Sequence, residues 1–197
     1  MTRWQQFLDT WKECTKCPLH QTRKSVVLAR GSLPCDILFI GEAPGESEDV
    51  CGVPFIGPAG KLLDQIVTAS LRGRALRCAF TNLIACIPRD PINLTKYTEP
   101  PEESIEACTP RLQEFVEIAN PKLLVAVGTT AKDFLEPGFK WSISFHKPLP
   151  CVDIYHPSYI LRINTAQRTL ASQRCIVAIS QAIDKVFKTV DNSATKR

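Results

Sequence analysis

An acidic, glycine-rich stretch, GEAPGESEDVCGVPFIGPAG, follows an apolar run and occupies residues 41–60. Its carboxylates are Glu42, Glu46, Glu48 and Asp49. Backbone amides at the start of a helix favour anions, but these carboxylates would repel a phosphate, and neither the dinucleotide fingerprint nor the Walker lysine pattern is present. The stretch therefore fits a neutral ligand, or a reaction in which positive charge develops. The structural alternative is a turn whose acids cap the starts of helices.

Two other polar residues stand where apolar runs end. Asn82 follows AFT, and His156 follows CVDIY and precedes Pro157. An asparagine at a strand end commonly closes a turn, and a single histidine is as often a structural group as a reactive one. Their chemical interest comes from their position beside the acidic loop, which depends on the fold.

Nine cysteines, an odd number, occur in a chain without a recognisable export signal, so metal or cluster binding is favoured over a disulfide framework. Cys14 and Cys17 form a CxxC pair, and Cys86 and Cys108 could complete a shell of four thiolates. Such a shell fits a 4Fe–4S cluster or a tetrahedral zinc ion, and spacing alone does not choose between them. Most of the remaining cysteines, Cys35, Cys51, Cys78, Cys151 and Cys175, are expected to be small buried side chains.

The elements that must position these residues alternate between strands and helices. Apolar runs predict strands over 35–41, 79–86, 123–128 and 151–156, and helical periodicity predicts helices over 2–14, 59–71, 100–119, 129–135 and 165–190. Pro110 is expected to kink or split the third of these helices. The predicted fold class is α/β, with an open, mainly parallel central sheet flanked by helices on both faces. Ligands of such sheets bind at the carboxyl ends of the strands, where the acidic loop, Asn82 and His156 all fall.

The length of 197 residues predicts one domain over 1–190 and a disordered tail over 191–197. A net charge of +4 and a pI near 8.6 do not reach the range typical of strongly basic nucleic-acid-binding domains. The N-terminal residues lack the apolar core of a signal peptide, and no apolar run is long enough to span a membrane. We expect a cytoplasmic monomer without membrane contact.

GEAPGESEDVCGVPFIGPAGKLLD, TNLIAC and HPSYILR, in this order and together with the four cysteines, resemble the uracil-DNA glycosylase superfamily, specifically its family 4. The resemblance runs from about Cys14 to Arg162. It implies an enzyme that removes uracil from DNA, on a parallel-sheet α/β fold. It also implies that Cys14, Cys17, Cys86 and Cys108 hold a 4Fe–4S cluster with a structural role, zinc being the alternative.

The resemblance also implies a pocket for an extruded base. Glycosylases must take the base out of the stack to reach the glycosidic bond. Phe55 would stack on the ring, and the Asn82 amide would read the uracil edge by donating to a carbonyl and accepting from the ring N–H. Gly41 and Ala43 would line the same pocket. Ala43 stands where another family of the superfamily has a water-activating aspartate.

Cleavage gives the sugar cationic character and leaves a uracil anion, so carboxylates suit the sugar and donors suit the base. By the resemblance, Glu42 or Glu48 would orient water or balance the cation, and His156 would donate to the uracil oxygen. The choice between the two glutamates stays open.

The residues after the histidine would contact DNA, single- or double-stranded. Pro157 and Ser158 would press the backbone, Ile160 or Leu161 would wedge into the gap left by the base, and Arg162 would meet a phosphate.

The chain departs from the family pattern at several places. Ile87 replaces a common arginine, the segment between Cys86 and Cys108 is long, and SISFHKPLP (142–150) replaces an expected arginine–glycine pair. The alternative functions are a protein that binds or traps uracil or damaged DNA without turnover, and a zinc-stapled domain without base chemistry.

Overall fold

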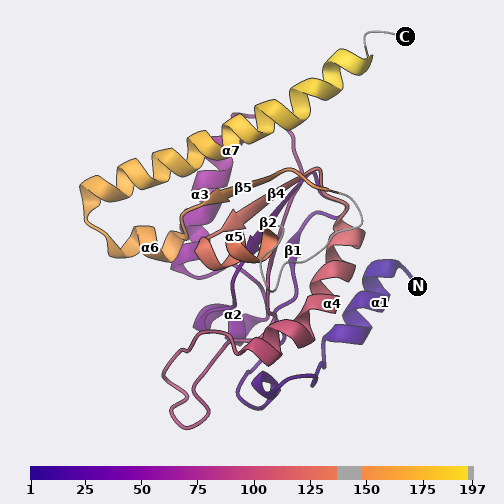
Figure 1. Cartoon of the computed structure of the whole chain (residues 1–197), viewed down its shortest axis with the longest axis vertical. Coiled ribbons are helices and arrows are strands. Elements are labelled where there is room, and N and C mark those ends of the chain that lie inside the picture. The colour runs from indigo at the N-terminus through magenta and orange to yellow at the C-terminus, as the bar shows by residue number, and fades with distance from the viewer. Residues whose placement is uncertain (137–147, 195–197) are drawn as a thin grey trace.

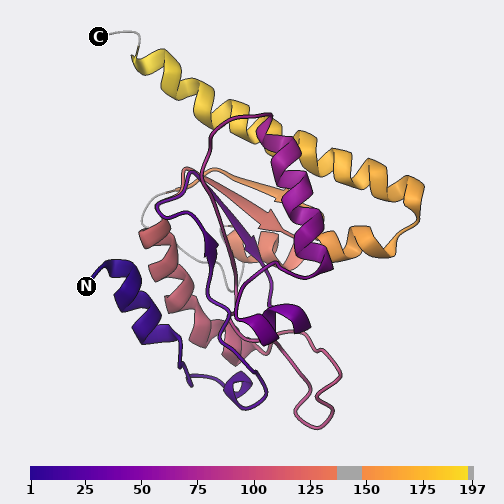
Figure 2. The same ribbon diagram turned by 180° about the vertical axis from the view of Figure 1, so that it is seen from behind.

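The computed structural model of the chain describes residues 1–136 and 148–194, with 188–194 described by their backbone. The helices are α1 (Arg3–Trp11), η1 (Pro18–Gln21), α2 (Glu46–Cys51), α3 (Pro58–Leu71), α4 (Glu102–Ala119), α5 (Thr129–Leu135), α6 (Pro157–Arg162) and α7 (Thr165–Ala194). The strands are β1 (Arg30–Gly31), β2 (Ile37–Gly41), β3 (Cys78–Asn82), β4 (Leu123–Val127) and β5 (Cys151–Ile154). Figures 1 and 2 show these elements from opposite sides.

The strands form one sheet in the order β1-β3-β2-β4-β5. The β3–β2, β2–β4 and β4–β5 pairs are parallel, and only the short edge strand β1 pairs antiparallel among the described strands. Because β2 and β4 lie in the middle, all of their residues are buried. The mainly parallel α/β sheet predicted from the sequence is confirmed.

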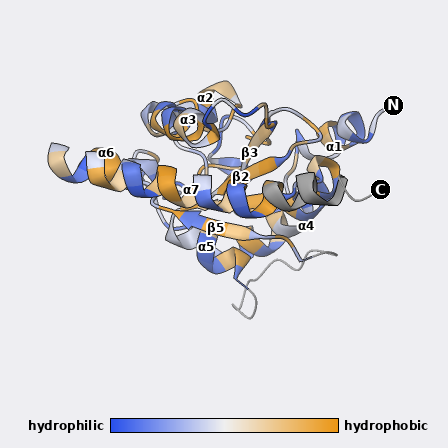
Figure 3. Cartoon of the chain, turned by 90° about the horizontal axis from the view of Figure 1, so that it is seen from above, coloured by the Kyte–Doolittle hydropathy of each residue, from blue (hydrophilic) through white to orange (hydrophobic). Residues whose placement is uncertain are grey.

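Helices cover both faces of this sheet. Alternate residues of β2 point to opposite sides: Leu38 and Ile40 pack in one apolar core with α1, α4 and α5, and Ile37 and Phe39 pack in a second core with α3 and α7. Figure 3 shows the hydrophobic strands lying between α3 and α5. No helix among the described residues is long and apolar enough to cross a membrane.

Several elements differ from the sequence-based expectation. β3 ends at Asn82, four residues before the predicted end, because residues 83 and 84 turn to donate their amides to the carbonyls of Gly41 and Glu42. α4 continues through Pro110, so the expected split is wrong. α7 runs to Ala194, past the predicted end at 190. The short helices α2 and α6 were not predicted, because both lie directly beside the strand ends within glycine- or proline-containing loops.

The carboxyl ends of β2, β3, β4 and β5 meet at one edge of the sheet, because these strands run in the same direction. The loop between Cys86 and α4 projects from this edge (Figures 1 and 2). Within it, Arg89 and Tyr97 form an isolated antiparallel bridge, which makes the loop a hairpin-like projection.

Candidate active site

The structure brings most of the predicted site residues together around one pocket of about 550 Å³ at the carboxyl edge of the sheet. Its lining includes Glu42, Ala43, Glu48, Phe55, Asn82, His156, Ser158 and Arg162. These residues come from the ends of β2, β3 and β5, from the loops that follow, and from the short helices α2 and α6. The convergence predicted from the strand pattern is therefore present.

Gly41 and Asn82 are paired across the parallel ladder of β2 and β3. A Cβ atom on Gly41 would lie 2.5 Å from Asn82 Oδ1 and 2.6 Å from Phe55 Cζ. Glycine is therefore required here, because any side chain would push apart the asparagine amide and the phenylalanine ring. Asn82 itself is only 3% exposed, so its amide is held within the wall of the pocket.

Phe55 is held in an unusual backbone conformation with a φ of 55°. Gly60 permits this approach, since a Cβ atom there would lie 1.9 Å from the Phe55 carbonyl oxygen. Arg30 donates to the carbonyl oxygens of Pro54 (2.8 Å) and Phe55 (3.3 Å), and it also pairs with Asp64 at 2.6 Å. The close approach of Gly60 and the hydrogen bonds from Arg30 thus fix the backbone of Phe55, and this backbone holds the ring in the wall of the pocket.

The two candidate glutamates have different surroundings. Glu48 Oε1 accepts hydrogen bonds from the amides of Ile56 (3.0 Å) and Gly57 (2.9 Å), and Gly57 is the N-cap of α3. Glu48 therefore fixes the loop that carries Phe55 and caps a helix start. Among the described residues, no hydrogen bond engages the half-buried Glu42 carboxylate. The Glu42 backbone is nevertheless anchored, because its carbonyl accepts from the amide of Ile84 at 3.1 Å.

The other two acids of the loop have structural partners. Arg89 pairs with Glu46 at 2.7 Å and with Asp49 at 3.0 Å, and Asp49 Oδ1 also accepts from the amide of Lys24 at 2.9 Å. Asp49 is fully buried. These contacts tie the projecting loop to α2, so three of the four carboxylates, Glu46, Glu48 and Asp49, have structural partners.

His156 ends β5 and is the N-cap of α6. Its Nδ1 accepts from the Ser158 amide at 3.2 Å and lies 2.7 Å from Ser158 Oγ. Because an amide N–H can only donate, the neutral ring carries its proton on Nε2. Burial lowers the pKa of His156 from its usual 6.5; nearby Arg162 lowers it further and Glu48 opposes this. The ring is therefore a neutral donor at neutral pH.

Several pocket residues were not predicted. Pro88, Tyr97 and Thr98 reach the pocket from the projecting loop, where no sequence pattern marks them. Tyr97 donates its hydroxyl to Glu46 at 2.8 Å. Gly128 could have been found from the sequence, because it directly follows the apolar run of β4 and so lies at the carboxyl edge of the sheet. A Cβ atom there would lie 3.0 Å from the His156 Cβ, which explains the glycine.

The residues expected to contact DNA are not equally accessible. Pro157 and Ile160 are buried, so neither presents its side chain to a DNA backbone or to a gap in the stack. Leu161 is half-buried and Arg162 is exposed. Of the two residues named as a possible wedge, the structure leaves Leu161 accessible. SISFHKPLP lies largely outside the described residues, because 137–147 are not described.

The four predicted cysteines line one cavity, beside Trp11, Arg23 and Arg111, at the base of α4. Cys14, Cys17, Cys86 and Cys108 are all free thiols. Among the side chains that the structure describes, in 1–136 and 148–187, no three from Cys, His, Asp or Glu are grouped closely enough for one metal ion. Thiol side chains gathered in one cavity are the donor type that both zinc and iron–sulfur clusters take.

The surroundings of this cavity suit an anionic group. Arg23 Nη1 donates to Cys86 Sγ at 3.5 Å, and Arg111 lines the same cavity. Burial raises the pKa of the free Cys86 thiol to about 12, so its thiolate requires positive charge nearby. Donor type, enclosure and neighbouring cations are therefore consistent with cluster binding.

A protein-family model described as "Uracil DNA glycosylase superfamily" matches residues 29–181. A type-4 uracil-DNA glycosylase of Thermotoga maritima is 40% identical over 161 residues, which cover 77% of this chain and 79% of the relative. That of Archaeoglobus fulgidus is 33% identical, covering 75% of this chain and 78% of the relative. That of Saccharolobus solfataricus is 38% identical, covering 64% of this chain and 56% of the relative. The chain belongs to the uracil DNA glycosylase superfamily.

Proposed function

We propose that this protein is a monofunctional uracil-DNA glycosylase, which hydrolyses the N-glycosidic bond of uracil in DNA and leaves an abasic site. The observation that carries the proposal is the shared pocket of Phe55, Asn82, Glu42 and His156, a base platform and a base reader beside an acid and a donor. The names of the similar proteins support the same activity.

The base would be held by its face and its edge. The Phe55 ring, 7% exposed, offers its face within the pocket and is backed by Phe80 at a centroid distance of 6.1 Å. The Asn82 amide has both a donor and an acceptor, which match the adjacent carbonyl and ring N–H of uracil. Cytosine presents an acceptor and an amino group at these places, so the pairing favours uracil.

His156 would stabilise the leaving base. Its Nδ1 is engaged by Ser158, so Nε2–H is the free donor. As the glycosidic bond breaks, negative charge develops on the uracil oxygens, and a fixed donor there lowers the barrier. Because the ring is neutral at neutral pH, it serves as a hydrogen-bond donor and keeps its own proton.

Glu42 would act on the sugar side, by orienting water and balancing the positive charge of the sugar. Its carboxylate is free of internal hydrogen bonds among the described residues, whereas Glu48 is engaged by two amides. We therefore assign the orientation of the attacking water to Glu42 and the positioning of Phe55 to Glu48.

Cys14, Cys17, Cys86 and Cys108 would hold a 4Fe–4S cluster, which when bound supplies a structural cross-link and no electrons for the hydrolysis. Cys86 lies four residues after Asn82, so ligation there would anchor the strand end that reads the base and the loop that follows. A brown protein that absorbs near about 400 nm supports a cluster, and a colourless zinc-loaded protein prepared without oxygen contradicts it.

The test of the function is an oligonucleotide with a single uracil, incubated with the protein and then treated with alkali. Strand scission at the uracil supports excision. A gel shift without scission at excess protein supports the alternative, a protein that binds DNA without turnover. That alternative has no specific observation in its favour, because both the acid and the donor are in place.

A further inference from the structure

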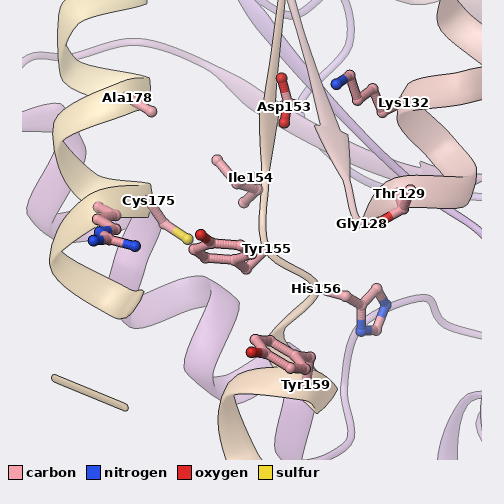
Figure 4. A pocket seen from close by; sticks show the side chains of 11 residues that line it. Gly128, Thr129, Lys132, Asp153, Ile154, Tyr155, His156, Tyr159, Cys175 and Ala178 are labelled. Carbon is pink, nitrogen blue, oxygen red and sulfur yellow. The ribbon is translucent and has the colours of Figure 1, made fainter. Parts of the chain in front are cut away.

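A second groove lies next to the proposed uracil pocket, between α5 and α7 and along the end of β5 (Figure 4). It has a volume of about 570 Å³. Gly128, Thr129 and His156 line both this groove and the proposed uracil pocket. The two depressions are therefore neighbours that share one wall.

Two exposed tyrosines stand in this groove. Tyr155 is 43% exposed and Tyr159 is 46% exposed, and their ring centroids lie 5.8 Å apart. Figure 4 shows the Tyr155 ring directed toward Cys175 of α7, with Tyr159 below it and His156 on the opposite side of the backbone. Neither tyrosine hydroxyl forms a hydrogen bond with another described residue. Adjacent exposed rings of this kind are suited to stacking against a planar group.

The charges around the groove are mainly positive. Lys132 from α5 and Arg174 from α7 are both exposed, and neither forms an ion pair within the described part of the chain. Arg162, which lines the neighbouring uracil pocket, is also exposed and forms no ion pair among the described residues. Asp153 is the one carboxylate in the described lining. This balance is complementary to a phosphate backbone.

We propose that the groove binds the nucleotides that adjoin the uracil on one side of a single strand, with a base against Tyr155 and Tyr159 and phosphates near Lys132 and Arg174. The proposal rests on the proposed function, because the groove adjoins the pocket across the wall of Gly128, Thr129 and His156 and is therefore within reach of a strand whose uracil occupies the pocket. Unpaired bases have a free face, so a single strand uses the tyrosines better than a duplex does.

The test compares Tyr159→Ala with Tyr159→Phe on three single strands: one with a central uracil, one lacking the 5′ flank and one lacking the 3′ flank. Loss of one base stack corresponds to about 5- to 150-fold. Tyr159→Ala should raise the half-saturating protein concentration by this factor on the central-uracil strand and on one truncated strand. On the strand that lacks the bound flank, the penalty should disappear, and Tyr159→Phe should behave as wild type throughout. No penalty, or an equal penalty on all three strands, would overturn the proposal.

Salt dependence gives a second, independent readout. Lys132→Gln and Arg174→Gln should each reduce the slope of log affinity against log salt by about 0.7 for single strands. Arg3→Gln, on α1, is the matched control and should leave the slope unchanged. Unchanged slopes in both groove variants would contradict the phosphate contacts. These affinities are measured with uracil-free DNA, so the groove is tested even if the protein excises no uracil.

Discussion

Arg111 Nη2 donates to the backbone carbonyl of Asn82 at 2.5 Å, from a guanidinium that also lines the cysteine cavity. The side chain is 1% exposed and also donates to Thr81 Oγ1 (3.0 Å) and to the Leu83 carbonyl (2.9 Å). Among the described residues it has no carboxylate partner, and its Nε lacks an acceptor. A buried cation therefore stands between the strand end that would read the base and the four thiols. An anionic cluster would balance its charge.

Arg111→Met should lower the stability of the fold and weaken the binding of the base by Asn82. It leaves three buried acceptors without their donor, so we expect a loss of about 2–4 kcal/mol in the free energy of unfolding, measured with denaturant. Because Asn82 loses its backbone anchor, the half-saturating substrate concentration should rise about 10- to 100-fold. Arg3→Met is the control: the exposed Arg3–Glu117 pair should contribute about 0–1 kcal/mol. If both variants lose the same free energy of unfolding, the hydrogen bonds of Arg111 contribute no more to stability than an exposed ion pair does.

Glu42→Gln and Glu48→Ala should separate the roles of the two glutamates. Glu42→Gln removes the free carboxylate, so the single-turnover rate should fall about 10²- to 10⁴-fold with little change in unfolding. Glu48→Ala removes the acceptor of two amides, so stability should fall by about 1–2 kcal/mol. Glu48→Gln keeps an oxygen acceptor and should retain most of that stability. A large rate loss in Glu48→Gln beside a normal rate in Glu42→Gln would reverse the assignment.

The rate should have an acid limb below pH 6.5 that belongs to His156. Protonation of Nδ1 removes the acceptor of the Ser158 amide, and with it the contact that orients Nε2. Since burial and Arg162 lower the pKa of His156 from 6.5, the ring stays neutral until the pH falls below that value. The unfolded chain binds this proton more readily, so this group also lowers stability as the pH falls through the same window.

Arg162→Gln supplies the check on this limb. Removing the cation should raise the pKa of His156 and move the limb to higher pH, whatever happens to DNA affinity. The measurement is the single-turnover rate at saturating protein from pH 4.5 to 8. If the acid limb has the same midpoint pH in Arg162→Gln as in the wild type, the limb reports the titration of a group other than His156.

Gly41→Ala should damage the pocket more than the fold. The added methyl would lie 2.5 Å from Asn82 Oδ1, so the amide and the Phe55 ring must move apart. We expect a loss of about 1–3 kcal/mol in stability and a large loss of uracil binding. Gly73→Ala is the control, since its φ of 78° imposes strain while its surroundings are open. That variant should lose about 1 kcal/mol and keep its activity.

The sheet and the place of the site could be predicted from sequence patterns. The apolar runs around Phe39 and Val125 mark buried parallel strands, and the carboxyl ends of parallel strands converge at one edge. That rule alone predicts that Glu42, Asn82 and His156 lie together, as they do in the pocket. The grouping of the four cysteines was also predicted, although it depended on the resemblance as well as on spacing.

Roles that depend on hydrogen bonds could not be predicted. Glu42 and Glu48 are alike in the sequence, and only the positions of the Ile56 and Gly57 amides separate them. Tyr97 reaches the pocket because Arg89 ties its loop to α2, a contact between residues far apart in the chain. The single domain over 1–190 and the monomeric state remain predictions.

The most direct measurement is the amount of free uracil released per molecule of protein from excess single-uracil DNA. A glycosylase should release many uracils per protein and an equal number of abasic sites, and DNA with cytosine at the same position should release no base. Release of none, or of at most one equivalent that stays bound to the protein, would contradict the proposed turnover and favour a binding or trapping protein.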